Sequence, residues 1–211
     1  MSSRYESLTG PTDLDFPEYD CPPPEPLELA GRWLATAVDI GVREPKALAL
    51  ATADSRGRPS SRTVIVQEFD RRGLLFITHA TSQKGREIAE NGWASGLLYW
   101  RETAQQLIFS GPVVRLGAAE ADLLWAGRPT PLLSMSTASW QSAPLEDPEA
   151  VLKEAERLAV LREPLPRPDR FAGYRLEPTA VEFWAAASSR LHRRLRYDLT
   201  EDGWRPVRLH P

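Results

Sequence analysis

The chain has 211 residues, of which 42% are hydrophobic and 26% charged, a composition typical of one globular domain with a substantial core. Its net charge of −3 argues against general nucleic-acid binding, and no apolar run is long enough to span a membrane. A single cysteine, Cys21, excludes an intrachain disulfide, and three widely spaced histidines argue against a zinc or other metal site.

Residues 1–25 are rich in proline and acidic residues and predict an extended arm ahead of a single domain over residues 26–211. We expect a partner subunit to order this arm. The chain begins Met1-Ser-Ser-Arg-Tyr-Glu-Ser, which lacks the apolar core of a signal peptide, and a cytoplasmic protein is therefore expected.

Apolar residues recur at helical spacing from Pro26 to Val38, and Gly41 ends the pattern. The rest of the chain consists mostly of short strand patterns joined by turns. Strands are expected at residues 47–53, 62–69, 74–78, 93–100, 105–116, 174–176, 180–184, 190–197 and 204–209, and helices at 82–91, 118–127 and 149–161. Because the early connections are too short for parallel crossovers, this order predicts a mainly β protein, an antiparallel barrel with peripheral helices.

The stretch from Ser189 to Tyr197 carries four arginines and a histidine. In a strand, Arg190, His192 and Arg194 would share one face and form a surface suited to a carboxylate or phosphate. A solvated basic strand is the commoner origin of such a pattern, and the segment alone does not decide between them.

A second cluster follows Thr78. Ser82 suits a helix N-cap, yet Lys84 and Arg86 fall in or beside the first turn, where the helix dipole disfavours a cation by roughly 0.3–1 kcal/mol. An anion bound at the helix start would make the cations favourable there. If both side chains are simply solvated, the protein tolerates this small penalty. Arg62, Gln106, Gln141, Ser142 and Trp184 are weaker candidates, since each also suits an ordinary structural position.

The order and spacing of these residues resemble the pyridoxamine 5′-phosphate oxidase family of split-barrel flavoproteins. The resemblance covers residue 40 to the C-terminus and is most specific in the closing stretch, with Glu182-Phe-Trp, Arg190-Leu-His, Tyr197 and the terminal Arg208-Leu-His-Pro. Within the family, Ser82-Gln-Lys-Gly-Arg-Glu and the segment from Trp93 to Thr103 look like the flavin-dependent oxidases of phenazine biosynthesis.

The resemblance implies a homodimer with FMN at the subunit interface and site residues from both chains. Arg62 and Lys84 would hold the FMN phosphate, with help from Thr78 and Gln83. The flavin would be lined by Thr63, Val64 and Ile65 and met at its edge by Gln106, and the site would be completed by Gln141, Ser142, Trp184 and Arg194.

The chain departs from the parent family where that family binds the substrate phosphate. A lysine of the family is Gln67 here, and a tyrosine and a serine are Leu124 and Leu132, while Arg128 remains. A buried phosphate needs charge-assisted donors, so these changes suit an apolar, fused aromatic substrate better.

The resemblance therefore implies an FMN-dependent oxidase that dehydrogenates a reduced, carboxylated phenazine precursor and uses oxygen to reoxidise the flavin. Arg190 and His192 are the candidate catalytic residues, by holding the carboxylate of this tricyclic substrate or moving a proton. Two alternatives stay open: pyridoxamine 5′-phosphate oxidation, and a non-catalytic flavin- or haem-binding split barrel.

Overall fold

The computed structural model describes residues 10–161 and 163–211, so residues 1–9 of the predicted arm lie outside the described part of the chain. The elements in chain order are η1 (Pro17–Tyr19), α1 (Pro26–Asp39), β1 (Ala47–Ala53), β2 (Pro59–Ile65), β3 (Glu68–Asp70), β4 (Gly73–His79), α2 (Gln83–Asn91), β5 (Trp93–Trp100), β6 (Gln105–Arg115), α3 (Ala118–Ala126), α4 (Thr130–Ala138), α5 (Pro148–Ala159), β7 (Phe171–Leu176), β8 (Ala180–Ala185), β9 (Arg193–Thr200) and β10 (Gly203–Leu209). No helix within the described residues is long and apolar enough to cross a membrane.

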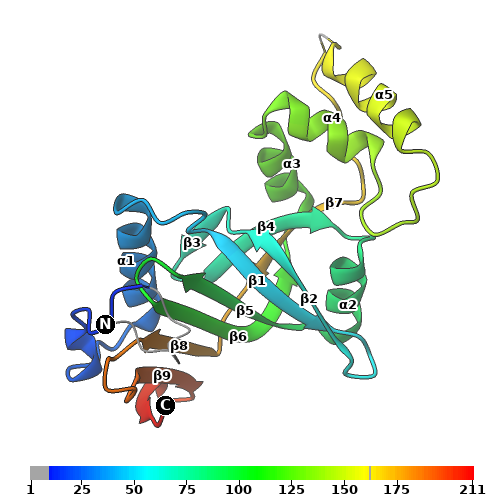
Figure 1. The fold of residues 1–211 in the computed structure, drawn as a ribbon. Helices are drawn as coiled ribbons and strands as arrows, with labels where there is room; N and C mark the ends of the chain where they lie inside the picture. Colours follow the sequence, from blue (N-terminus) through cyan, green and yellow to red (C-terminus); the bar gives the residue numbers. More distant parts are fainter. Residues whose placement is uncertain (1–9, 162) are drawn as a thin grey trace.

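The strands form a barrel-like antiparallel sheet in the order β10-β9-β8-β6-β5-β1-β2 (Figure 1). The long strand β6 bends the sheet back, because residues Gln105–Ser110 pair with β8 while Val113–Arg115 pair with β7. Strand β7 then pairs with β4, and β4 with β3. The predicted mainly β antiparallel barrel with peripheral helices is confirmed.

Alternation of side chains along the strands fills the core. The inward residues Leu48, Leu50, Leu98, Leu107, Phe109, Phe183, Leu195 and Tyr197 are all buried. The outward residues of β1 and β5 are small or only partly covered, so one face of this sheet is left without a layer from its own chain.

The arm is packed on its own chain over residues 10–25. Phe16 is buried against the rings of Trp33 and Phe183, at centroid distances of 4.9 and 6.4 Å. The Asp13 N–H donates to the Ala186 carbonyl at 3.0 Å. These contacts hold residues 10–25 against their own chain, whereas a partner subunit was expected to order the arm.

Two predicted strands have different limits. The strand expected over residues 62–69 is divided, because the Val66 N–H bonds Lys46 O on one side and the Gln67 N–H bonds Leu75 O on the other. The chain passes there from pairing with β1 to pairing with β4, and β2 and β3 meet at a corner. The strand expected from Arg190 begins at Arg193, since Ser188–Arg190 form a turn and Arg190 has a φ of 64°.

Helix α4 was missed by the sequence analysis. Pro129 and Pro131 flank its start and its interior is rich in serine and threonine, both of which resemble a loop. Proline is nevertheless well placed in the first turn, where the backbone N–H groups have no helical partner. Helices α3, α4 and α5 stand together beyond the beginning of β7 (Figure 1).

Candidate functional site

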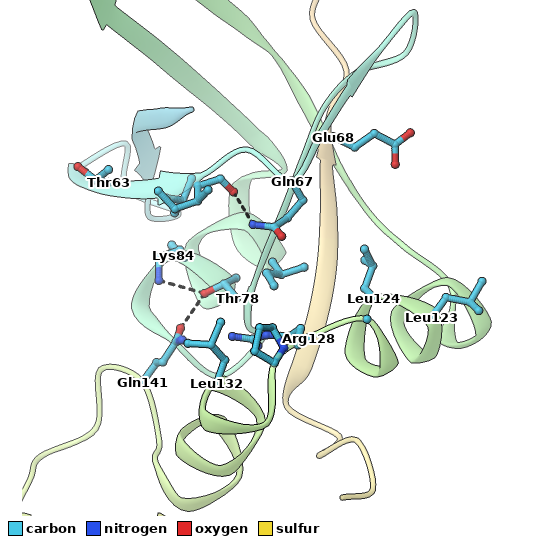
Figure 2. Close-up of a pocket in the computed structure, with 15 residues that line it drawn as sticks. Thr63, Gln67, Glu68, Thr78, Lys84, Leu123, Leu124, Arg128, Leu132 and Gln141 are labelled. Atoms are coloured by element: carbon cyan, nitrogen blue, oxygen red, sulfur yellow. Dashed lines mark hydrogen bonds between the residues drawn. The ribbon is translucent and has the colours of Figure 1, made fainter. Parts of the chain in front are cut away.

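A cavity of about 740 Å³ lies between the corner of β2 and β3, the end of β4 and the helices α2, α3 and α4 (Figure 2). Its walls are mixed, with a polar end beside α2 and an apolar end beside α3. The lining residues are Thr63, Val64, Ile65, Gln67, Glu68, Ile77, Thr78, Lys84, Leu123, Leu124, Gly127, Arg128, Pro129, Leu132 and Gln141.

Three side chains at the polar end are joined through one hydroxyl. Lys84 Nζ donates to Thr78 Oγ1 at 3.0 Å, and that hydroxyl donates to Gln141 Oε1 at 2.8 Å (Figure 2). Burial and then the nearby Arg62 lower the pKa of Lys84, with Glu87 opposing them. The Ser82 hydroxyl caps α2 by accepting from the Gly85 N–H at 3.3 Å, as expected. This end of the cavity therefore combines a half-buried ammonium with a helix N-terminus, an arrangement that favours an anion.

Arg62 lies on the other face of β2 from Thr63, under α2. Its Nη2 is 3.1 Å from Glu87 Oε2, and Nη1 donates to Thr52 Oγ1 at 2.5 Å. Burial opposes ionisation of Glu87, but hydrogen bonds from Ser60, Thr52, Gln83 and Arg62 outweigh it and lower its pKa to about 2. Arg62 is thus fixed by a carboxylate before any ligand binds.

His79 ends β4 next to Thr78 and is almost fully buried, with 1% of its surface exposed. Its Nδ1 accepts from the Gln141 backbone N–H at 3.4 Å, and its own backbone N–H donates to Gln141 Oε1 at 3.3 Å. Burial, followed by Arg170, Arg128 and Lys84, lowers the pKa of His79 to about 4, so the imidazole is neutral near pH 7.

The opposite end of the cavity is mostly apolar, with one cation, Arg128, and one carboxylate, Glu68, at its border. Leu123 and Leu124 come from α3 and Leu132 from α4, and Leu123 is 76% exposed at the rim. The Arg128 guanidinium lies 5.3 Å from the centre of the Phe171 ring and donates to Ser136 Oγ at 3.2 Å. Gln67, at the corner, turns its amide back to the Ile65 carbonyl at 3.2 Å.

Gln106, Trp184 and Arg194 lie elsewhere, in a single row across the sheet. Tyr99 pairs with Gln106, Gln106 with Trp184 and Trp184 with Arg194, and residues paired directly across an antiparallel sheet share a face. Four strand steps separate β2 from β8, or about 19 Å at the usual strand spacing. One protomer therefore does not bring this row to its own cavity.

Arg190 and His192 flank the same row from the turn before β9. The His192 ring is 4.8 Å from the Trp184 ring, and its Nδ1 accepts from the Ala187 N–H at 3.1 Å. Arg190 is in the left-handed region, so the expected strand face shared by Arg190, His192 and Arg194 does not exist. Arg194 is paired with the buried Glu182 at 2.7 Å.

The structure thus divides the predicted residues into two groups. Thr63, Val64, Ile65, Gln67, Thr78, Lys84, Leu124, Arg128, Leu132 and Gln141 line one cavity, and Arg62 and Gln83 meet at Glu87 beside it. Gln106, Trp184, Arg190, His192 and Arg194 form the second group. Ser142 follows Gln141 with a φ of 66° and is exposed.

Sequence reasoning missed several residues of this region, and those with polar or exposed side chains are His79, Glu87, Glu68 and Leu123. A signal existed for Glu87, which lies three residues after Lys84 and four after Gln83 and so shares their helix face. His79 gave none, because its partner Gln141 is 62 residues away in the sequence.

Comparison with known proteins places the chain among flavoprotein oxidases. The family model described as pyridoxamine 5′-phosphate oxidase matches residues 34–185, and the model for the pyridoxine 5′-phosphate oxidase C-terminal dimerisation region matches residues 171–211. A dihydrophenazinedicarboxylate synthase from Burkholderia lata is 58% identical over 210 residues, covering 100% of this chain and 99% of its own. A pyridoxine/pyridoxamine 5′-phosphate oxidase from Paraburkholderia phymatum is 42% identical, covering 94% and 93%.

The fold is also similar to a solved structure. The crystal structure of PhzG from Burkholderia lata in complex with tetrahydrophenazine-1-carboxylic acid superposes with a TM-score of 0.94 at 57% identity, covering 96% of this chain and 100% of that one.

Proposed function

Because this chain belongs to the pyridoxamine 5′-phosphate oxidase family, we propose that it is an FMN-dependent oxidase that removes hydrogen from a reduced, carboxylated phenazine precursor. The observation that carries the substrate assignment is the apolar end of the cavity. Leu124, Leu132 and Gln67 stand there beside a single cation, Arg128, whereas a phosphate-binding pocket would need further hydroxyl and cationic donors. The 58% identity to a dihydrophenazinedicarboxylate synthase supports the same choice.

The residues at the polar end fit FMN. Lys84 has the Thr78 hydroxyl as its hydrogen-bond partner within the described residues, and a phosphate at this helix start would supply the missing anion. Strand β2 is the last strand of its sheet, so backbone groups along Thr63–Ile65 have a free edge to offer a flat heterocycle with imide edges. When bound, FMN would accept hydride from the substrate and return electrons to oxygen.

The apolar end would hold the tricyclic substrate. Leu123, Leu124 and Leu132 supply apolar contacts for the flat ring system, and Arg128 supplies the one cation at this end of the cavity. Its guanidinium makes one hydrogen bond within the described residues, to Ser136, and keeps donors for a carboxylate. Burial lowers the pKa of Arg128, yet a guanidinium remains charged at neutral pH.

A homodimer would complete the site. The outward face of β1, β5 and β6 carries small or apolar residues such as Ala49, Ala51, Leu97 and Ile108, and is uncovered in one chain. A second copy packed on this face would bring its own row of Gln106, Trp184 and Arg194 over the cavity. His192 Nε2 is then the atom that would hold or deliver a proton, because Nδ1 is occupied by the Ala187 N–H.

A turnover assay tests the proposal. The purified protein is given reduced phenazine carboxylic acids or pyridoxamine 5′-phosphate under air, and oxygen uptake and product are followed. We expect FMN-dependent oxidation of the phenazine precursor and poor turnover of the phosphate ester. Efficient oxidation of pyridoxamine 5′-phosphate would favour the parent activity, and bound flavin without turnover of either would favour a non-catalytic carrier.

A further inference from the structure

The loop of residues 139–142, which follows α4, carries Gln141 to the polar end of the cavity and is held from two sides. On one side Arg170 donates to the Ser139 carbonyl at 3.2 Å and stacks on the Trp140 ring at 4.1 Å. On the other side the end of β4 holds Gln141, through the Thr78 hydroxyl and both the backbone and the ring of His79. The loop itself has no regular structure, so its position depends on these contacts.

His79 differs from the other anchors because it accepts the hydrogen bond. Its Nδ1 takes the Gln141 N–H, while Arg170 and Thr78 act on the loop's oxygen atoms and the Trp140 ring. An acceptor at this place must be a neutral imidazole, and burial, followed by the surrounding cations Arg170, Arg128 and Lys84, lowers the pKa of His79 and keeps it neutral. The Nε2 atom has no hydrogen-bond partner within the described residues, although it is buried. A buried unpaired donor is costly, so packing alone gives no reason for a histidine rather than a leucine at this position.

We propose that His79 is a positioning residue for the cofactor site: its Nδ1 fixes the Gln141 backbone and thereby places Gln141 and Ser142 for contact with the flavin. This inference rests on the proposed flavin site. His79 does not line the cavity and touches no reacting atom. It acts through Gln141, whose side chain does line the cavity and shares the Thr78 hydroxyl with Lys84.

The test uses two substitutions that differ in the acceptor. In His79→Asn the amide oxygen stands close to the place of Nδ1 and keeps an acceptor, whereas His79→Leu fills similar space without one. His210→Leu is the matched control, since it removes an exposed imidazole far along the chain from the loop. Unfolding temperatures of the flavin-free proteins establish that each variant is folded.

The first readout needs no flavin. Hydrogen exchange of the Gln141 amide, measured on flavin-free protein, should be faster in His79→Leu than in wild type and close to wild type in His79→Asn and His210→Leu. Unchanged exchange in His79→Leu would overturn the proposal. So would faster exchange throughout β4 and β7, because that pattern would make His79 a general packing residue.

The second readout is FMN affinity, from quenching of flavin fluorescence. Loss of one hydrogen bond predicts roughly three- to tenfold weaker binding in His79→Leu, with recovery in His79→Asn. In a Gln141→Ala background the same His79→Leu change should have a smaller effect, because His79 acts through Gln141. Equal effects in both backgrounds, or failure of Asn to restore binding, would contradict the inference. Wild-type protein that binds no FMN would instead refute the proposed function. The exchange experiment would still test whether His79 holds the Gln141 backbone, because it uses flavin-free protein.

Discussion

Arg62 and Glu87 form a buried ion pair, with 3.1 Å between Nη2 and Oε2 and 19% and 8% of the two side chains exposed. The carboxylate also accepts hydrogen bonds from Ser60 and Gln83 at 2.8 and 2.9 Å. The arginine proposed to bind the FMN phosphate is thus held in place by a carboxylate on the same helix as Lys84. Its position is set by the protein before the cofactor arrives, which reduces the ordering that binding must impose.

Glu87→Leu should destabilise the flavin-free protein. The substitution leaves the Arg62 guanidinium buried without its counter-charge, a loss of about 3–5 kcal/mol. We expect added FMN to restore more stability to the variant than to wild type, because the phosphate supplies an anion close to Arg62. Thermal unfolding with and without FMN measures both effects. An equal gain in stability in the two proteins would mean that Arg62 does not contact the phosphate.

Acid should destabilise the protein in part through His79. Its folded pKa, about 4, lies below the ordinary 6.5, so the unfolded chain binds a proton at higher pH than the folded one does. The folded state therefore loses stability as pH falls from about 6.5 to 4, by up to about 3 kcal/mol at roughly 1.4 kcal/mol per pKa unit. Urea unfolding across this range should show a shallower decline in His79→Asn, and parallel curves for the two proteins would exclude His79 as a source.

Local patterns were enough to predict most of the fold. The strands at residues 47–53 and 93–100 have the predicted limits because alternation puts Leu48, Leu50 and Leu98 into the core, and Ser82 caps α2 as its side chain suggests. The corner at Val66 and Gln67 was not predictable in this way. No glycine or proline marks a turn between Val64 and Phe69, and the corner shows only in the hydrogen-bond partner, which changes from Lys46 to Leu75.

The candidate site was predictable where it rests on the resemblance, and not where it rests on contacts between distant residues. Lys84, Thr78 and Gln141 do lie together. The bond from His79 to Gln141 and the turn that takes Arg190 out of its strand depend on tertiary packing and on a φ of 64°, which no residue pattern announces.

Gln67→Lys should raise activity towards pyridoxamine 5′-phosphate. The side chain stands at the corner of β2 and β3 on the cavity wall, and an ammonium there would gain a charge-assisted bond to a substrate phosphate. Such a bond is worth roughly 1.5–3 kcal/mol, which corresponds to an increase in kcat/KM of at least about tenfold. Steady-state kinetics on both substrate classes would check this, with Gln67→Met as a control of similar length without charge.

Arg190→Ala should impair oxidation of the phenazine precursor and leave FMN occupancy nearly unchanged. Arg190 lies on the turn next to His192 and Trp184, apart from the cluster around Lys84 that would hold the phosphate. We expect kcat/KM to fall by about ten- to a hundredfold if the guanidinium binds the substrate carboxylate. Flavin absorbance per protein chain gives the occupancy, and a parallel loss of flavin would assign Arg190 to the cofactor instead.

Ala49→Arg should separate the protein into monomers and weaken FMN binding at the same time. Ala49 pairs with Thr63 on one side and Leu97 on the other, so it stands in the middle of the uncovered sheet face that carries the cavity edge and continues to Gln106. A guanidinium there would be buried without a partner when a second copy packs on this face. Light scattering of wild type and variant, with flavin absorbance of each, measures both effects. Val160→Arg is the control, because Val160 is 79% exposed at the end of α5, off this face. A flavin-loaded Ala49→Arg monomer would mean that Trp184 and Arg194 of a second chain are dispensable for the cofactor. An unaltered dimer would move the interface to another surface.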